Sequence, residues 1–207
     1  CVSHNDSTKF LHKLRSLFIP TVYAYCSPEE IYTITFTLTQ EEPEQTGGPS
    51  VIFLPGIQAN ELYEGSNRVW LPSILSNDVE RLAMDESGES INDISVGESL
   101  RKPFGIVEIY NEFFAFLDEL SATGTIHKWH QIPYDWRHDV FDVVTNDILL
   151  NDGTTMDMVA KVKETANHAP TGKLVIIAHS NGGLLGKALI EALGTEAEDT
   201  IDQFIMV

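Results

Sequence analysis

The chain has 207 residues, of which 43% are apolar and 21% are charged. This composition is typical of a soluble globular core and argues against a disordered or fibrous protein. The net charge of -18 would repel the phosphate backbone of nucleic acids and the anionic headgroups of lipids, so nucleic-acid binding is not expected. No apolar run approaches the roughly 18 residues that a membrane-spanning helix needs.

Residues 1–45 are predicted to be an extension in front of a main domain of residues 46–207. The two cysteines, Cys1 and Cys26, are compatible with a disulfide or with two free thiols. Basic residues followed by the apolar run 17–25 resemble a signal-peptide remnant, which would make the protein secreted, but a plain strand or linker explains the run equally well. Residues 31–39 alternate between apolar side chains and threonines, which predicts a half-buried strand.

Four apolar runs predict strands buried on both faces: residues 51–54, 125–132, 174–178 and 201–207. Apolar residues at helical spacing lie between them, over residues 104–120, 156–166 and 184–193. Thr154 with Asp157 three residues later marks the start of the second helix, and Gly194 marks the end of the third. Strands that alternate with helices predict an α/β fold with a mostly parallel sheet and helices on both faces.

Residues 66–101 fit this alternation least well. They combine the apolar segment around Trp70 with an acidic stretch over residues 85–89. A long insertion of this kind is expected to leave the sheet. It is either a lid over the substrate or a decoration packed on the surface, and the sequence leaves both open.

The sequence Ala-His-Ser-Asn-Gly-Gly, residues 178–183, follows one predicted strand directly and opens a helix. A serine on such a strand–turn–helix is the nucleophile elbow of serine hydrolases, which needs small residues two positions before and after the serine. Ala178 and Gly182 occupy those positions around Ser180. The competing interpretation is a serine that only caps the helix.

An elbow places the serine hydroxyl at a helix start, where a backbone amide and the helix dipole favour negative charge. The amide of Asn181 is therefore a candidate oxyanion donor. The second donor is expected from the loop after a neighbouring strand, and the Pro55-Gly56 turn ends such a strand. The amide of Ile57 is the first choice there, followed by that of Gln58.

The block Pro-Tyr-Asp-Trp-Arg, residues 133–137, follows the predicted strand of residues 125–132. With Leu-Pro-Gly at residues 54–56, Trp70 and the elbow, in that order, it resembles the lecithin:cholesterol acyltransferase family, including its bacterial and phospholipid:diacylglycerol acyltransferase relatives. The resemblance covers about residues 51–207. It implies an α/β-hydrolase fold and an enzyme that moves a fatty acyl group from a lipid ester to a serine, then to water or an alcohol.

The resemblance also implies roles for individual residues. Ser180 corresponds to the nucleophile, and Ile57 and Asn181 correspond to the oxyanion positions. The region of Trp70 corresponds to a mobile lid that touches lipid, so a transient contact with a lipid interface is expected. Lids of animal members are closed by a disulfide, and this chain has no cysteine there.

Other polar residues are interpreted structurally. A carboxylate and a guanidinium two residues apart, Asp135 and Arg137, are expected to hold their loop in place rather than to catalyse. His127 and His130 are expected on opposite faces of one strand, so that they cannot form one site. No second ligand pair at zinc spacing accompanies Cys1, so neither a metal nor another cofactor is indicated.

A serine nucleophile needs a histidine and an acid, which follow the serine in this fold. No histidine follows Ser180, and Asp199 and Asp202 are expected at the opposite end of the sheet. The prediction is that acid and base lie beyond Val207, so that the chain is a C-terminally truncated and inactive part of the enzyme. Alternatives are a non-catalytic binding protein of the same fold, or another serine hydrolase such as a thioesterase or peptidase. The oligomeric state and the choice between hydrolase and transferase stay open.

Overall fold

The computed structural model describes residues 22–27, 30–34, 47–72, 78–100 and 110–207. The chain divides into two compact units, residues 1–44 and 45–207. In the first unit, β1 (Val22–Ser27) and β2 (Glu30–Ile34) pair as an antiparallel hairpin. The strand predicted over residues 31–39 coincides with β2 as far as Ile34, and its remainder lies outside the described residues. Cys1 and most of the signal-like segment lie outside them as well.

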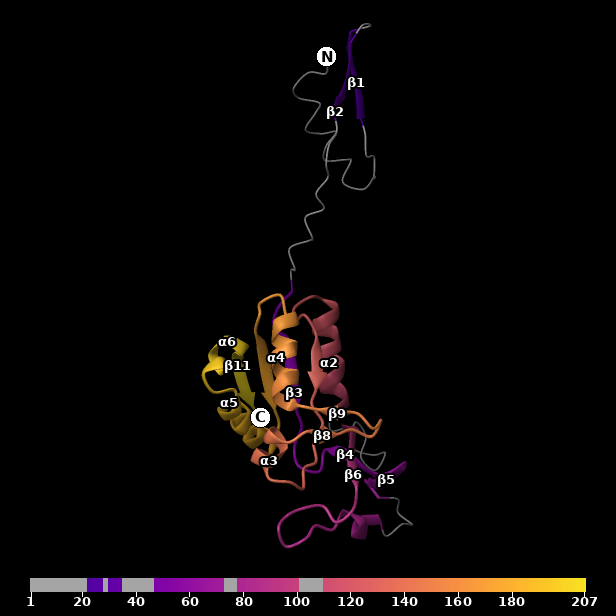
Figure 1. Cartoon of the computed structure of the whole chain (residues 1–207), viewed down its shortest axis with the longest axis vertical. Coiled ribbons are helices and arrows are strands. Elements are labelled where there is room, and N and C mark those ends of the chain that lie inside the picture. The colour runs from indigo at the N-terminus through magenta and orange to yellow at the C-terminus, as the bar shows by residue number, and fades with distance from the viewer. Residues whose placement is uncertain (1–21, 28–29, 35–46, 73–77, 101–109) are drawn as a thin grey trace. The chain divides into compact units, whose positions relative to one another are not determined.

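A four-stranded parallel sheet forms the centre of the second unit (Figure 1). Its strands stand in the order β11 (Ile201–Met206), β10 (Leu174–Ala178), β3 (Ser50–Leu54) and β7 (Trp129–Gln131). Neighbouring strands run parallel throughout, so helical crossovers must connect them. The predicted strands at residues 51–54, 174–178 and 201–207 are confirmed, but β11 is half-buried to exposed instead of buried on both faces, because it is the outermost described strand of the sheet. The one predicted over residues 125–132 is shorter, because turns occupy residues 123–127.

Helices follow the strands as the predicted alternation requires. They are α2 (Asn111–Ala122), α3 (Val140–Thr145), α4 (Met158–His168), α5 (Gly182–Leu193) and α6 (Ala197–Thr200), with a 3-10 turn η4 (Gly194–Glu196) after α5. α5 ends at Leu193, and Gly194 caps it with a positive φ of 55°, so the predicted end of this helix is confirmed. Residues 104–109 of the first predicted helix lie outside the described residues.

The predicted start of the helix over residues 156–166 is wrong by two residues. Asp157 rather than Thr154 caps α4, because its carboxylate accepts a hydrogen bond from the amide of Ala160 at 2.9 Å. The residues just before it form β9 (Thr155–Met156), which pairs with β8 (Ile148–Leu149) as a short antiparallel hairpin.

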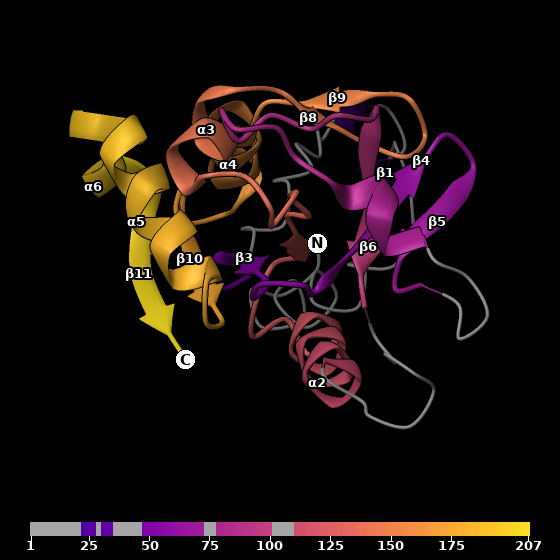
Figure 2. The ribbon, with the colours of Figure 1, turned by 90° about the horizontal axis from the view of Figure 1, so that it is seen from below.

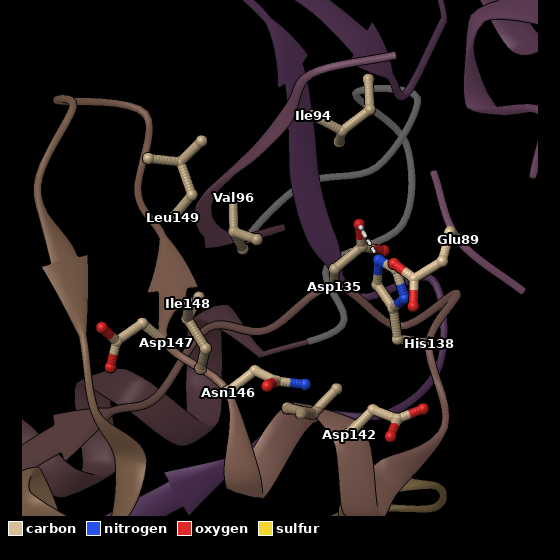
Figure 3. Close-up of a pocket in the computed structure, with 11 residues that line it drawn as sticks. Glu89, Ile94, Val96, Asp135, His138, Asp142, Asn146, Asp147, Ile148 and Leu149 are labelled. Atoms are coloured by element: carbon tan, nitrogen blue, oxygen red, sulfur yellow. Dashed lines mark ion pairs between the residues drawn. The ribbon is translucent and has the colours of Figure 1, made fainter. Parts of the chain in front are cut away.

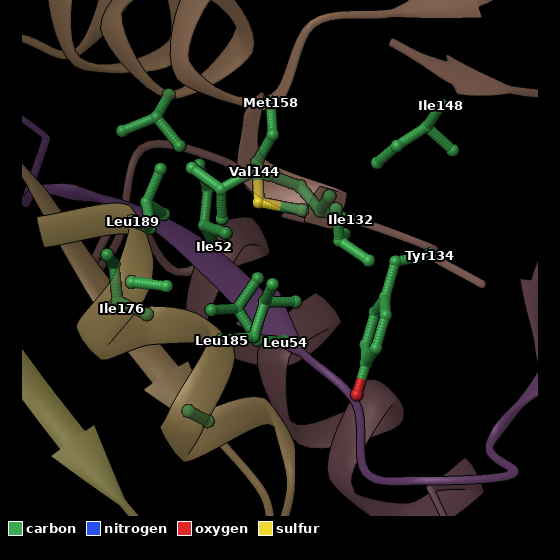
Figure 4. Close-up of a cluster of buried hydrophobic side chains, with 14 of the residues drawn as sticks. Ile52, Leu54, Ile132, Tyr134, Val144, Ile148, Met158, Ile176, Leu185 and Leu189 are labelled. Atoms are coloured by element: carbon green, nitrogen blue, oxygen red, sulfur yellow. The ribbon is translucent and has the colours of Figure 1, made fainter. Parts of the chain in front are cut away.

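Alternate side chains of the central strands enter two apolar clusters. Ile52, Leu54 and Ile176 pack with residues of α3, α4 and α5 (Figure 4). Val51, Phe53 and Val175 pack with α2 in the other cluster. Figure 2 shows α2 and the pair α3 and α4 on opposite sides of β3. This packing explains why β3 is an uninterrupted apolar run, since all of its residues are buried.

The chain leaves the parallel sheet after β3 and forms a second sheet before it returns. β5 (Asn67–Trp70), β4 (Asn60–Glu64) and β6 (Ile94–Ser99) are antiparallel neighbours in that order, and η2 (Asp78–Leu82) is a 3-10 turn between β5 and β6. An excursion in this region was predicted, but its strands were not. Each contains few buried apolar residues, such as Leu62, Val69 and Val96, which makes a weak periodic signal. In the described residues, no helix has the length and apolarity needed to cross a bilayer.

We predict that Gly182→Ala lowers the free energy of unfolding by about 1–3 kcal/mol. A Cβ atom at position 182 would lie 2.3 Å from the carbonyl oxygen of Leu54 and 2.7 Å from that of Pro55. Gly183→Ala is the matched control, because a Cβ there meets only Met206, at 3.4 Å or more. Urea unfolding of both variants makes the comparison, and equal destabilisation would contradict the proposed close contact.

Candidate active site

Ser180 lies on a sharp turn between β10 and α5. Its φ of 54° falls in the left-handed region, which residues other than glycine rarely adopt, and the residue is exposed. The amide of Ser180 donates to the carbonyl oxygen of Val207 at 2.9 Å, and the amide of Gly183 donates to the carbonyl oxygen of Ser180 at 2.8 Å. The sharp turn predicted at this position is therefore present, with hydrogen bonds on both sides.

Two glycines bring this turn against the loop after β3. Gly182 leaves no room for a Cβ atom beside the carbonyl oxygen of Leu54. On the other side, a Cβ atom on Gly56 would lie 2.9 Å from Nδ1 of His179 and 3.2 Å from Cβ of Ser180. Because β3 and β10 are adjacent and parallel, their carboxyl ends meet at one edge of the sheet. The loop over residues 55–59 and the elbow are thus in contact.

Neither predicted oxyanion donor uses its backbone amide within the described part of the chain. Among the described residues, the amides of Ile57 and Asn181 have no hydrogen-bond partner, whereas the amides of Ala59 and Gly182 donate to backbone carbonyls. Gln58, between Ile57 and Ala59, has a positive φ of 60°. An oxyanion hole requires amides that are not already used by the protein. Ile57 and Asn181 meet that requirement among the described residues, one directly after Gly56 and the other directly after Ser180.

Two tryptophans hold the loop from outside. The indole N–H of Trp70 donates to the carbonyl oxygen of Gln58 at 2.9 Å, and that of Trp136 donates to the carbonyl oxygen of Asn60 at 3.3 Å. The two rings are in edge-to-face contact, with centroids 5.1 Å apart and planes at 62°. These contacts make Trp70 a support of the loop that carries Ile57. Its contact with a lipid stays a prediction.

Asn60 links the loop to both sheets. Its side chain is fully buried, donates from Nδ2 to Oγ of Ser99 on β6 at 3.1 Å, and accepts through Oδ1 from the amide of Tyr134 at 3.3 Å. A buried amide group costs little only when its polar atoms are paired. Asn60 therefore fixes β4 to the segment after β7, where residues 133–137 lie.

Asp135 and Arg137 form the loop-holding pair that was predicted. Their closest atoms, Oδ2 and Nη2, are 2.5 Å apart. Arg137 also donates to the carbonyl oxygen of Leu82 and to Oγ of Ser90, so it attaches the excursion to this loop. The Arg137 side chain is only 4% exposed, and the hydrogen bonds described for it all go to protein groups, which agrees with the predicted structural role.

A cavity of about 360 Å³ lies beside this pair (Figure 3). Asp135 and His138 are neighbours on its lining, with His138 Nε2 3.6 Å from Oδ2 of Asp135. Three further carboxylates line the cavity, from Glu89, Asp142 and Asp147. Ser180, Ile57 and Asn181 do not line it, so the cavity is separate from the candidate site.

A second cavity, of about 420 Å³, brings together two histidines that were predicted to lie apart. His127 and His130 both line it, together with Lys128, Lys161 and His168. They were expected on opposite faces of one strand. That prediction is wrong because β7 begins only at Trp129, so His127 precedes the strand and is not bound by its alternation. Burial, and then the charges of Lys161 and Lys128, lower the pKa of His130.

The described part of the chain pairs Ser180 with neither an acid nor a histidine. Asp202 lies at the start of β11, where Ile201 pairs with Leu174, whereas the far end of the strand pairs Met206 with Ala178. Asp199 lies in α6 before that strand. Both carboxylates are therefore at the end of the sheet opposite Ser180, as predicted. Within the described ranges, no group of three or more His, Cys, Asp or Glu side chains could hold a metal ion.

We predict that Trp70→Phe speeds amide hydrogen exchange at Ala59 and lowers the free energy of unfolding by about 0.5–1.5 kcal/mol, because the loop loses one hydrogen bond. Trp129→Phe is the matched control. It removes a similar indole hydrogen bond, to Oδ1 of Asp118 at 2.8 Å, away from the loop. Unchanged exchange at Ala59 in Trp70→Phe would contradict the supporting role.

We predict that Lys161→Gln raises the pKa of His130, because the protonated ring then faces one positive charge fewer while Glu164 and Lys128 remain. A folded-state pKa below that of the unfolded chain means that stability is full above the ordinary value of 6.5 and is lost as the pH falls below it. The Lys161→Gln variant should therefore lose less stability than the wild type as the pH falls. NMR titration of the ring protons measures the pKa, with Lys187→Gln as control, and an unchanged or lower pKa would refute the charge effect.

Comparisons of this chain with family models, with curated proteins and with solved structures find no match. Its function must therefore be argued from the arrangement of its own residues.

Proposed function

We propose that this chain carries the nucleophile and the oxyanion donors of a serine acyl-hydrolase or acyltransferase of the α/β-hydrolase fold. One observation carries the proposal. Ser180 is exposed on a left-handed turn, in contact with the loop after the neighbouring strand, and the free amides of Ile57 and Asn181 lie on the two segments that meet there. A helix-capping serine does not require a positive φ, so this backbone favours the elbow over the cap.

The chemistry follows from these groups. Oγ of Ser180 attacks the ester carbonyl carbon and passes its proton to a base. Negative charge then develops on the carbonyl oxygen, where the amides of Ile57 and Asn181 stabilise it. Collapse of this intermediate breaks the ester C–O bond, releases the alcohol and leaves an acyl-enzyme. Water or a second alcohol takes the acyl group in the next step. The acid and base are still predicted to lie outside residues 1–207.

Exposed apolar side chains near the elbow support an ester with an apolar acyl group. Ile57 is 57% exposed in the loop, and Leu184 is 55% exposed in the first turn of α5. Burying large apolar side chains of this kind against an apolar ligand is favourable in free energy. Together with the order of the motifs, this favours a lipid ester and the lecithin:cholesterol acyltransferase-like family. A transient contact with a lipid interface belongs to the same proposal.

We predict that Ser180→Ala reduces ester hydrolysis by on the order of 1,000-fold or more in the natural protein that supplies the acid and base. Hydrolysis of short- and long-chain nitrophenyl esters is the measurement. Ser121→Ala, a serine on α2, is the matched control and keeps full activity. Activity that survives Ser180→Ala would refute the proposal and leave the non-catalytic binding protein as the better reading. Ser180-dependent turnover by residues 1–207 alone would contradict the predicted position of the acid and base.

A further inference from the structure

Two buried tyrosine hydroxyls join the loop after β3 to the elbow, one on each side of Ser180. The hydroxyl of Tyr134 donates to the carbonyl oxygen of Pro55 at 3.0 Å and accepts from Nδ2 of Asn181 at 3.1 Å. The hydroxyl of Tyr110 accepts from the amide of Gly56 at 3.1 Å and lies 2.9 Å from Nδ1 of His179. Two consecutive loop residues are thus tied to the residues immediately before and after the candidate nucleophile.

The direction of each hydrogen bond follows from proton counting. A tyrosine hydroxyl has one proton, and a backbone amide can only donate. Tyr110 therefore accepts from Gly56, which leaves its own proton available for the contact with Nδ1 of His179. Tyr134 works in the opposite sense, since it donates to the loop and accepts from the elbow. Both hydroxyls are thus used once as donor and once as acceptor.

The two tyrosines reach the loop from opposite faces of the sheet. Tyr110 belongs to the apolar cluster with α2, where its ring meets Phe53 edge to face at 4.9 Å. Tyr134 is completely buried in the other cluster, with Leu54 and Leu185. Because each ring is anchored in packed apolar surroundings, its hydroxyl has a fixed position.

Burial also keeps both hydroxyls protonated. It raises the pKa of Tyr134 to about 12 and raises the pKa of Tyr110 as well. Neither hydrogen-bond pattern is therefore lost by ionisation of the tyrosines at neutral pH.

We propose that Tyr110 and Tyr134 are positioning residues that set the separation of the Ile57 and Asn181 amides, and so shape the oxyanion hole before substrate binds. Ile57 directly follows the Gly56 amide that Tyr110 holds, and Asn181 is the residue whose side chain Tyr134 holds. A displacement of about 1 Å between groups that stabilise a transition state costs on the order of 100-fold in rate. The inference rests on the proposed function, because the separation matters only if Ser180 forms an acyl-enzyme.

The test compares Tyr110→Phe and Tyr134→Phe with Tyr63→Phe in the natural protein that supplies the acid and base. Tyr63 is the matched control, since its hydroxyl donates to Oε2 of Glu61 at 2.7 Å on β4. The expected result for the first two variants is a fall in kcat of on the order of 10- to 100-fold with little change in KM, whereas Tyr63→Phe keeps both. A rise in KM at constant kcat, or wild-type kinetics, would overturn the proposal.

One readout does not depend on turnover. Gly56 should show slow amide exchange in the wild type and fast exchange in Tyr110→Phe. An unprotected Gly56 amide in the wild type would also overturn the inference.

A second pair of variants changes the partner of Tyr110. His179→Gln retains an acceptor for Tyr110 and should keep more activity than His179→Leu. This comparison guards against a tyrosine variant that simply fails to fold.

The two possible failures remain distinguishable. If Ser180→Ala leaves hydrolysis unchanged, the proposed function is wrong and the positioning role is wrong with it. If Ser180→Ala abolishes hydrolysis while both tyrosine variants keep the wild-type kcat, only the positioning role is wrong.

Discussion

The absence of a side chain at Gly182 is the constraint on which the site depends. α5 begins against the carbonyl oxygen of Leu54, at a separation that no Cβ atom would permit. This contact fixes the start of a helix to the end of the central strand, and leaves only three residues for the chain to turn from β10 into α5. The left-handed backbone of Ser180 follows from that short connection, so the exposure of its hydroxyl is a result of packing.

Aromatic side chains supply most of the hydrogen bonds that surround the loop. Trp70, Trp136, Tyr110 and Tyr134 each place a single polar atom at the tip of a large apolar ring. Such residues bring hydrogen bonds to a buried backbone without burying a charge. In this chain the loop is held in this way through neutral polar atoms.

Local patterns in the sequence predicted the parts of the fold that are continuous in the chain. The apolar runs of β3 and β10, the glycine that ends α5 and the turn at Ser180 all depend on neighbours within a few residues. The contacts of Tyr110 with Gly56 and His179 join residues 54 and 69 positions apart, so no local pattern could reveal them. The strands of the second sheet were not predicted because they bury few apolar side chains. His127 was assigned to a strand because the predicted strand began at residue 125, whereas β7 begins at Trp129.

The second sheet begins where the loop ends, since β4 starts at Asn60. Loop and sheet are one uninterrupted length of backbone, and Trp70 adds a second attachment from β5 to Gln58. The antiparallel sheet is therefore directly connected to the segment that bears the Ile57 amide. A displacement of β5 would act on that segment through two connections, the backbone of β4 and the hydrogen bond of Trp70.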